Sequence, residues 1–379
     1  MPKYLRFFLL ASAGLLLLYR GWSRAGRVGD DTSLPAQPQP EITFYEVGNP
    51  GAAVRLVGIQ PYMQPADYAT GLRFYQRLND YFAAAAQRGL LPAGAVVVLP
   101  EHLGTWLVAA GEKQAVFTNP HSQDALRLVA LSNLSSFVRA MWRSSAQDKV
   151  TAALFLMKAR QTAAIYEWTF KKLAADYQVT IVAGSVVLPD AVVKDGHIVP
   201  VGNKLYNASF VFTPDGRMEP AVVRKQYPIE AEQPFCEPAG GMLPAFNTAA
   251  GRLGVAICAD SWYPSVYEQL QTAGVEVMAV PSYSTPDSLW ATPWQGYNGA
   301  AMPDDVRPQD VGNITEEQAW LRYSMGGRAA TAGVRYGINV FLRGQIWDLG
   351  DDGRTIVYYE GNTYLATPYE GPQITVVRY

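Results

Sequence analysis

The stretch from Leu253 to Pro264 constrains the fold of this chain more than any other. It begins with an apolar run through Ile257 that has the length of a buried strand and suits a parallel sheet covered on both faces. Cys258 stands where that strand should end, and Pro264 then opens a helical pattern. A thiol on such a strand-to-helix turn is well placed for nucleophilic attack, because the sheet holds it rigidly. A buried structural cysteine is the alternative, since a free thiol packs as a small apolar group.

Composition narrows the class of protein. The length of 379 residues allows one large domain or two ordinary ones, and a net charge of −2 gives no reason to expect nucleic acid as a partner. The two cysteines, Cys236 and Cys258, cannot make a disulfide framework. The chain has no CxxC, HExxH or Cys/His cluster and no glycine-rich nucleotide motif. We therefore expect neither a catalytic metal nor a cofactor.

The N-terminal segment has the pattern of an export signal. Lys3 and Arg6 precede an apolar run of 12 residues, Phe7 to Leu18, which is short against the ~20 residues that span a bilayer. Because no convincing cleavage site follows, we predict an uncleaved signal anchor at residues 1–27 that holds the protein at the periplasmic side of a bacterial inner membrane. The alternatives are a cleaved signal peptide with a secreted or periplasmic product, and a soluble cytoplasmic protein. Residues 28–50 are predicted to be a flexible linker.

The remainder, residues 51–379, alternates strand and helix patterns, which predicts a layered α/β domain. The predicted strands are 54–60, 95–101, 179–188, 204–212, 221–224, 253–257, 275–281, 338–342, 355–359 and, as an edge strand, 374–377. The predicted helices are 72–89, 161–177 and 316–333.

Two insertions interrupt this alternation. Residues 111–160 have a helical pattern and many apolar side chains, which indicates additional core or a dimer surface. The alternative is a hydrophobic arm that contacts a membrane or a lipid substrate. Residues 284–315 carry Trp290 and Trp294 among several prolines and glycines. A long structureless stretch with this aromatic content favours a lid or a substrate wall.

Three chemically different side chains follow separate predicted strands: the acid Glu101, the amine Lys225 and the thiol Cys258. Ligand sites of α/β sheets form at the carboxyl ends of strands, so these side chains are expected to meet. A carboxylate can take the proton of a thiol, and an ammonium can stabilise negative charge on an attacked carbonyl. A Cys–His pair is less well supported, because the side chain of His102 is expected to point away from that of its neighbour Glu101.

The three segments resemble the nitrilase, or carbon–nitrogen hydrolase, superfamily, whose members use a Glu–Lys–Cys triad. The matching motifs are VVVLPEHLGTW with Glu101, AVVRKQYPIE with Lys225 and GVAICADSWYP with Cys258, and NASFVFTPDGR before the lysine is a further likeness. The resemblance implies an α-β-β-α sandwich, a back-to-back dimer and a thioester acyl-enzyme that is resolved by water or by an amine.

The resemblance and the sequence pattern together supply further site residues. Many members carry a second glutamate about eight residues after the lysine. This chain has Gln233 at that position, and Glu230 and Glu232, just before it, are the candidates for the same role. The backbone N–H of Ala259 is expected to complete an oxyanion hole, and Asp260 to orient the loop. We predict a substrate wall of four aromatic residues: Trp262, Tyr283, Trp290 and Trp294.

These features favour an exported, membrane-tethered amidase-type hydrolase that cleaves a non-peptide C–N bond in a small-molecule amide. The N-terminal apolar segment and the two insertions also resemble the hydrolase domain of the apolipoprotein N-acyltransferases. That likeness favours, as the alternative, an N-acyltransferase that moves an acyl group from a lipid or a thioester to an amine. A catalytically inactive scaffold or binding module is the third hypothesis, although it has no need of all three polar residues.

Overall fold

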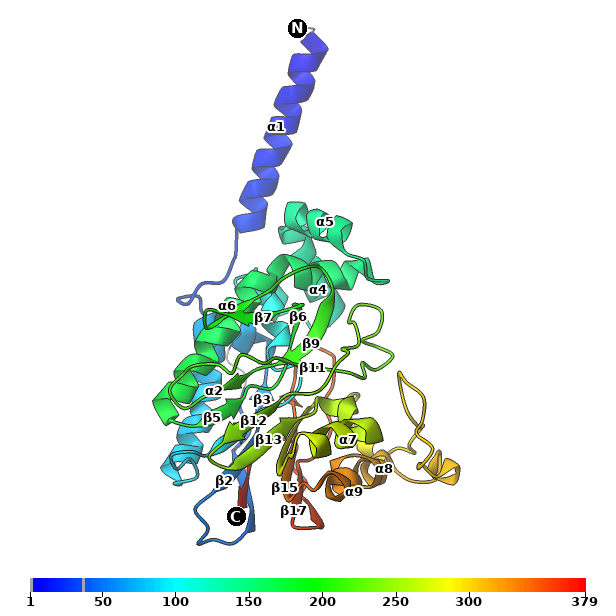
Figure 1. Cartoon of the computed structure of the whole chain (residues 1–379). Coiled ribbons are helices and arrows are strands. Elements are labelled where there is room, and N and C mark those ends of the chain that lie inside the picture. Colours follow the sequence, from blue (N-terminus) through cyan, green and yellow to red (C-terminus); the bar gives the residue numbers. More distant parts are fainter. Residues whose placement is uncertain (1–2, 36–37) are drawn as a thin grey trace.

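The computed structural model describes residues 3–35 and 38–379, and two six-stranded sheets form its centre (Figure 1). The first sheet has the order β1–β19–β2–β4–β5–β10: Thr43–Gly48, Gln373–Arg378, Arg55–Gln60, Val96–Val98, Thr180–Val182 and Val211–Phe212. The second has the order β12–β13–β14–β15–β17–β18: Ala245–Thr248, Gly251–Val255, Val277–Ser282, Tyr336–Phe341, Ile356–Tyr359 and Asn362–Leu365. Strands β2, β4 and β5 run parallel, as do β13, β14 and β15.

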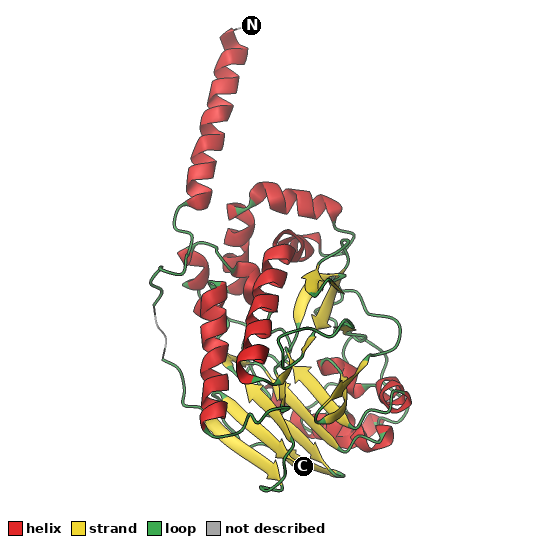
Figure 2. Cartoon of the chain, turned by 60° about the vertical axis from the view of Figure 1, so that its left-hand side comes forward, coloured by secondary structure: helices red, strands yellow, loops and turns green. Residues whose placement is uncertain are grey.

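Helices cover the outer face of each sheet (Figure 2). Along β2, Leu56 belongs to the core between the sheets, whereas Val57 faces the core shared with the helices α2, Gly71–Gln87, and α6, Lys149–Tyr177. Side chains of α7, Pro264–Thr272, and α8, Glu316–Tyr323, pack with those of the second sheet, and α9, Met325–Arg328, follows α8. This layering is the α-β-β-α sandwich that the resemblance implied.

Smaller elements complete the chain. Three short strands form a separate sheet in the order β11–β9–β6: Val223–Arg224, Leu205–Ser209 and Val186–Pro189. Two strand pairs are β7 with β8, Val192–Lys194 and His197–Val199, and β3 with β16, Tyr62–Met63 and Arg343–Gly344. The insertion at 111–160 folds into α3, Gln114–Phe117, α4, Ser122–Ser132, α5, Leu134–Arg143, and the start of α6. The insertion at 284–315 contains only two short 3₁₀ turns.

Two sequence predictions about the first sheet were wrong. The closing strand β19 lies inside the sheet, because Ile374 is in register with Phe44 of β1 on one side and with Ile59 of β2 on the other. The predicted linker 28–50 contains β1 itself, and Val28 and Leu34 are buried. Residues 36–37 of that linker lie outside the described residues. An edge strand with mostly half-exposed side chains carries no strong apolar alternation, so the sequence pattern misses it.

The N-terminal helix α1, Lys3–Arg24, projects from the body in both overall views (Figures 1 and 2). Residues 1–2 of the predicted anchor lie outside the described residues. Within the described part of the chain, we find no helix with both the length and the apolar content needed to cross a membrane. The base of α1 is fixed to the body, since the Tyr19 hydroxyl donates to the carbonyl of Leu131 at 3.0 Å and Arg27 pairs with buried Glu112 at 3.1 Å.

Candidate active site

Cys258 stands at a sharp turn between β13 and α7. Its φ of 48° is left-handed, which is uncommon for a residue with a side chain and marks a constrained turn. The thiol lies 3.8 Å from the carbonyl oxygen of Tyr283, which follows the neighbouring strand β14. Burial and the nearby Glu101 carboxylate raise the pKa of the thiol well above its usual value, against the lowering effect of Lys225. The resting side chain is therefore a thiol, and its reaction needs a base.

Lys225 brings two acids together beside this thiol. Its Nζ lies 2.7 Å from Oε1 of Glu101 and 2.6 Å from Oε2 of Glu232, and all three side chains are buried. Asn207 of β9 donates to the same two carboxylates, at 2.9 Å and 3.0 Å. Desolvation works against the charged lysine, but the two carboxylates hold the pKa of Lys225 well above its ordinary value. The site thus keeps a permanent cation next to an acid that can exchange a proton.

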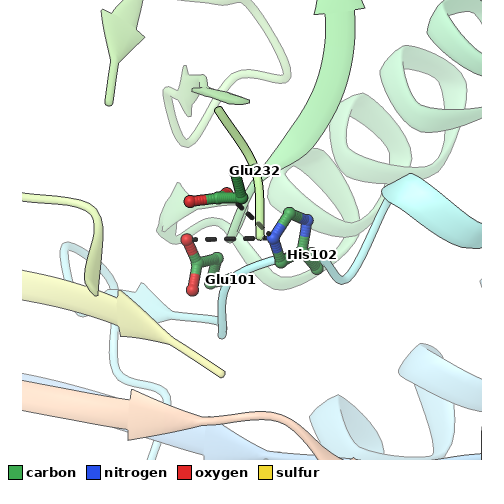
Figure 3. A group of neighbouring side chains, drawn as sticks. All are labelled: Glu101, His102 and Glu232. Atoms are coloured by element: carbon green, nitrogen blue, oxygen red, sulfur yellow. Dashed lines mark ion pairs between the residues drawn. The ribbon is translucent and has the colours of Figure 1, made fainter. Parts of the chain in front are cut away.

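His102 also belongs to this cluster, contrary to the sequence prediction (Figure 3). Its Nε2 lies 3.2 Å from Oε1 of Glu232 and 4.0 Å from Oε1 of Glu101. The backbone at His102 has a φ of 57°, so the usual alternation of neighbouring side chains does not hold there. The hydroxyl of Ser185 accepts the backbone N–H of His102 at 2.8 Å and supports the turn.

Glu101, His102 and Glu232 have ligand atoms within 4.8 Å of one another, close enough to hold a metal ion. Carboxylate oxygens and an imidazole nitrogen suit several divalent cations. In the structure both carboxylates face the ammonium group of Lys225, which already supplies a positive charge at this point.

Asp260 connects the thiol turn to the segment that carries Lys225. One carboxylate oxygen accepts the backbone N–H groups of Gln226 and Tyr227, at 2.9 Å and 2.8 Å, and the other accepts that of Ile257 at 3.4 Å. Full burial raises the pKa of Asp260 to about 7, partly offset by Lys225 and these N–H groups. Asp260 thus ties three backbone N–H groups of two segments to one carboxylate.

A cavity of about 210 Å³ contains the reactive groups. Among the predicted site residues, its lining includes Glu101, Lys225, Glu232, Cys258, Ala259, Trp262, Tyr283 and Trp294. Three predicted residues do not line it: Asp260, whose contacts are given above, Glu230 and Trp290. Glu230 is exposed, and its backbone N–H donates to Asn298 at 2.8 Å. Trp290 is buried behind the wall, 5.0 Å from Phe341 between ring centroids. The wall also contains Tyr263, Tyr297, Trp320 and Glu316. Aromatic content was the sole sequence signal for the first three, and Glu316 had none.

Solved structures share the fold of this chain at low sequence identity. One is a mutant of the amidase from Nesterenkonia sp. AN1 in complex with butyramide, with a TM-score of 0.53 and 15% identity over 87% of this chain and 92% of that one. Another is a mutant of the same amidase that records a Michael addition of acrylamide at the active-site cysteine, with a TM-score of 0.52 and 14% identity. It covers 86% of this chain and 93% of that chain. At such identities the likeness concerns the fold alone.

Sequence comparison gives the family. A curated relative, the deaminated glutathione amidase of Mus musculus, is 31% identical over 88 residues, which are 21% of this chain and 27% of the relative. The matched segment therefore spans about a quarter of that relative's length. The sequence model of the Carbon-nitrogen hydrolase family matches residues 54–297, which are more than half of the chain. This range contains Glu101, Lys225 and Cys258. This chain belongs to the carbon–nitrogen hydrolase family.

Proposed function

We propose that the protein is an amidase-type hydrolase that cleaves a non-peptide C–N bond through a thioester on Cys258. The supporting observation is the convergence of Glu101, Lys225 and Cys258 on one cavity, with Glu101 and Lys225 2.7 Å apart. These are the residue types that covalent attack on an amide needs: a nucleophile, a base and a fixed positive charge.

The first half of the reaction makes the thioester. Because the pKa of the thiol is raised, Glu101 takes its proton as the sulfur attacks the amide carbonyl. Negative charge develops on the carbonyl oxygen, where the Lys225 ammonium and the N–H of Ala259 stabilise it. The C–N bond then breaks, and Glu101 returns the proton to the departing amine.

The second half repeats the same proton transfers with water. Glu101 takes a proton from a water molecule that attacks the thioester carbonyl. The C–S bond breaks, the acid product leaves, and the proton returns to sulfur. Glu232, His102 and Asn207 hold Lys225 and Glu101 in place during both halves.

The test is intact-protein mass spectrometry and product analysis after incubation with short amides, nitriles and a bacterial lipid extract. The wild type should release carboxylic acid from an amide, with at most a transient acyl adduct, and Cys258→Ala should do neither. Cys236→Ala is the matched control, because Cys236 is the other buried free cysteine and does not line the cavity. A long-chain adduct formed only from lipid would replace the hydrolase by an acyltransferase. If the wild type forms no adduct and shows no turnover, the scaffold hypothesis is supported.

We further propose that α1 attaches the protein to a membrane. Its apolar side chains are strongly exposed, for example Phe7 at 75%, Leu10 at 73% and Leu18 at 72%. Exposed apolar surface of this extent is typical of segments that contact lipid or another protein. The base of α1 is joined through Tyr19 to the junction of α4 and α5, and on α5 Trp142 is 88% exposed. In this proposal, exposed apolar side chains of both helices contact one bilayer. The periplasmic location is a prediction from the sequence alone.

Co-sedimentation with vesicles of phosphatidylethanolamine and phosphatidylglycerol tests this attachment. Full-length wild type should sediment with the vesicles, Leu17→Asp should release most of it, and Trp142→Ala should weaken the binding. Trp168→Ala is the control, because Trp168 is also partly exposed but belongs to α6. Equal sedimentation of Leu17→Asp and wild type would rule out α1 as the attachment.

A further inference from the structure

One wall of the cavity is built from closely spaced aromatic rings. Trp262 lies at the centre, with its ring centroid 4.8 Å from Trp320, 5.6 Å from Tyr297 and 5.9 Å from Trp294. The four residues come from the turn after Cys258, from the 284–315 insertion and from α8. All four line the cavity, so a bound group there would contact aromatic atoms.

A carboxylate stands in the same wall. Glu316 is the first residue of α8 and is half-buried. Its neighbour Glu317 pairs with Arg354 at 2.9 Å, whereas no ion pair holds Glu316 within residues 3–35 and 38–379. The indole N–H of Trp320 is buried and lies within reach of the Glu316 carboxylate. Burial raises the pKa of Glu316 to about 7, and nearby Trp320 partly offsets this rise. Glu316 is therefore an acid without a counterion, next to aromatic rings.

The charges around the cavity favour a positive ligand. Three acids line it, Glu101, Glu232 and Glu316, against a single lysine, Lys225, which the first two already hold. The guanidinium of Arg328 donates to the hydroxyl of Tyr297 in the wall at 3.4 Å, but it is paired with Asp305 at 3.1 Å and does not line the cavity. A cleft with such an excess of acid concentrates cations.

From this arrangement we infer that the cavity binds an amide whose far end carries an ammonium-type cation. The cation lies against the rings of Trp262, Trp294 and Trp320 and faces the carboxylate of Glu316. Quaternary and alkylated ammonium groups are the ligands that aromatic walls recognise best, because the ring faces are negative and the methyl groups are easily desolvated. This inference rests on the proposed amidase function for the identity of the reacting end, but the cation site itself needs no turnover.

Calorimetry on the Cys258→Ala protein tests the site without chemistry. Choline and its uncharged isostere 3,3-dimethylbutan-1-ol have nearly the same shape, so their difference in affinity reports the charge. Choline should bind at least about tenfold more tightly, and Glu316→Gln should remove most of that preference. Glu317→Gln, the same substitution on the next residue of α8, should leave it unchanged. Equal binding of the two compounds, or choline binding that Glu316→Gln does not alter, would overturn the inference.

A matched pair of substrates links the site to the reaction. The wild type should hydrolyse 4-(trimethylammonio)butanamide with a higher kcat/KM than the uncharged 5,5-dimethylhexanamide, and Glu316→Gln should bring the two values together. If choline binds selectively but neither amide reacts, the cation site stands and the amidase proposal fails. If both amides react equally and choline shows no preference, the amidase stands and the cation site fails.

Discussion

Lys225 and Glu232, seven residues apart in the chain, meet as a buried ion pair with 2.6 Å between Nζ and Oε2. Burial alone would raise the pKa of Glu232, but Lys225 and His102 hold it well below its usual range. Of the two acids beside Gln233 that the sequence left open, Glu232 is therefore the one that reaches the site, while Glu230 faces solvent.

Replacing Glu232 by Gln should cost stability in a pH-dependent way. A glutamate with a lowered folded-state pKa stabilises the fold above its unfolded pKa, and this stabilisation is lost as the pH falls through the folded value. We expect a loss of roughly 3 kcal/mol in the free energy of unfolding at pH 7, because one partner of a buried pair is removed. The loss should shrink at pH 4, and urea unfolding at both values measures it. Glu230→Gln should change neither value, and an equal loss at both pH values would contradict the assignment.

Gly184 should not tolerate a side chain. It has a φ of 69°, and a Cβ built there would overlap the carbonyl oxygen of Pro100, directly before Glu101. Gly196 has a similar φ of 75° but open space around it. Gly196→Ala should therefore cost only the backbone strain, about 1–2 kcal/mol. Gly184→Ala should cost more and also lower kcat, since the strand end that carries Glu101 must move. Thermal unfolding and amide turnover of both variants test this prediction. Equal losses of stability in the two variants would show that the backbone at Pro100 shifts at little cost.

Choline affinity should rise with pH. Only the ionised carboxylate of Glu316 attracts the cation, and its pKa is about 7, so binding should strengthen between pH 6 and 8. Other titratable groups line the cavity or influence Glu316: Glu101, His102, Lys225, Glu232, Tyr263, Tyr283, Tyr297 and Asp352. Calorimetry on Glu316→Gln separates the titration of Glu316 from that of these groups, because choline binding to the variant should lose this pH dependence. An unchanged slope in that variant would place the titration on another of these groups.

Asp260→Asn should gain stability relative to the wild type as the pH rises. The folded-state pKa of Asp260 is about 7, above that of an aspartate in the unfolded chain. The free energy of unfolding therefore falls as the pH rises from the unfolded to the folded pKa, since the folded state resists ionisation. Asparagine keeps the oxygen that accepts from Gln226 and Tyr227 but carries no charge. The difference in melting temperature, variant minus wild type, should increase from pH 5 to pH 8. A constant difference over this range would mean that Asp260 is ionised throughout.

The sequence predicted the part of the site that strand ends determine. Glu101, Lys225 and Cys258 each follow an apolar run. The strands before them, β4, β11 and β13, belong to three different sheets whose ends converge on one cavity. It missed His102, because the alternation rule assumes extended backbone and this residue is left-handed. Asn207 stood inside the NASFVFTPDGR motif and could have been found from it. Glu316 could not, since its place in the wall depends on how the 284–315 insertion folds over α8.

The left-handed backbone at Cys258 also limits what this position can become. Serine keeps an unbranched Cβ and fits the turn, whereas threonine, with a branched Cβ, is strongly disfavoured at a φ of 48°. Any exchange of the attacking atom from sulfur to oxygen, by evolution or by design, must therefore pass through serine. A threonine at the same point would first require the turn between β13 and α7 to be rebuilt.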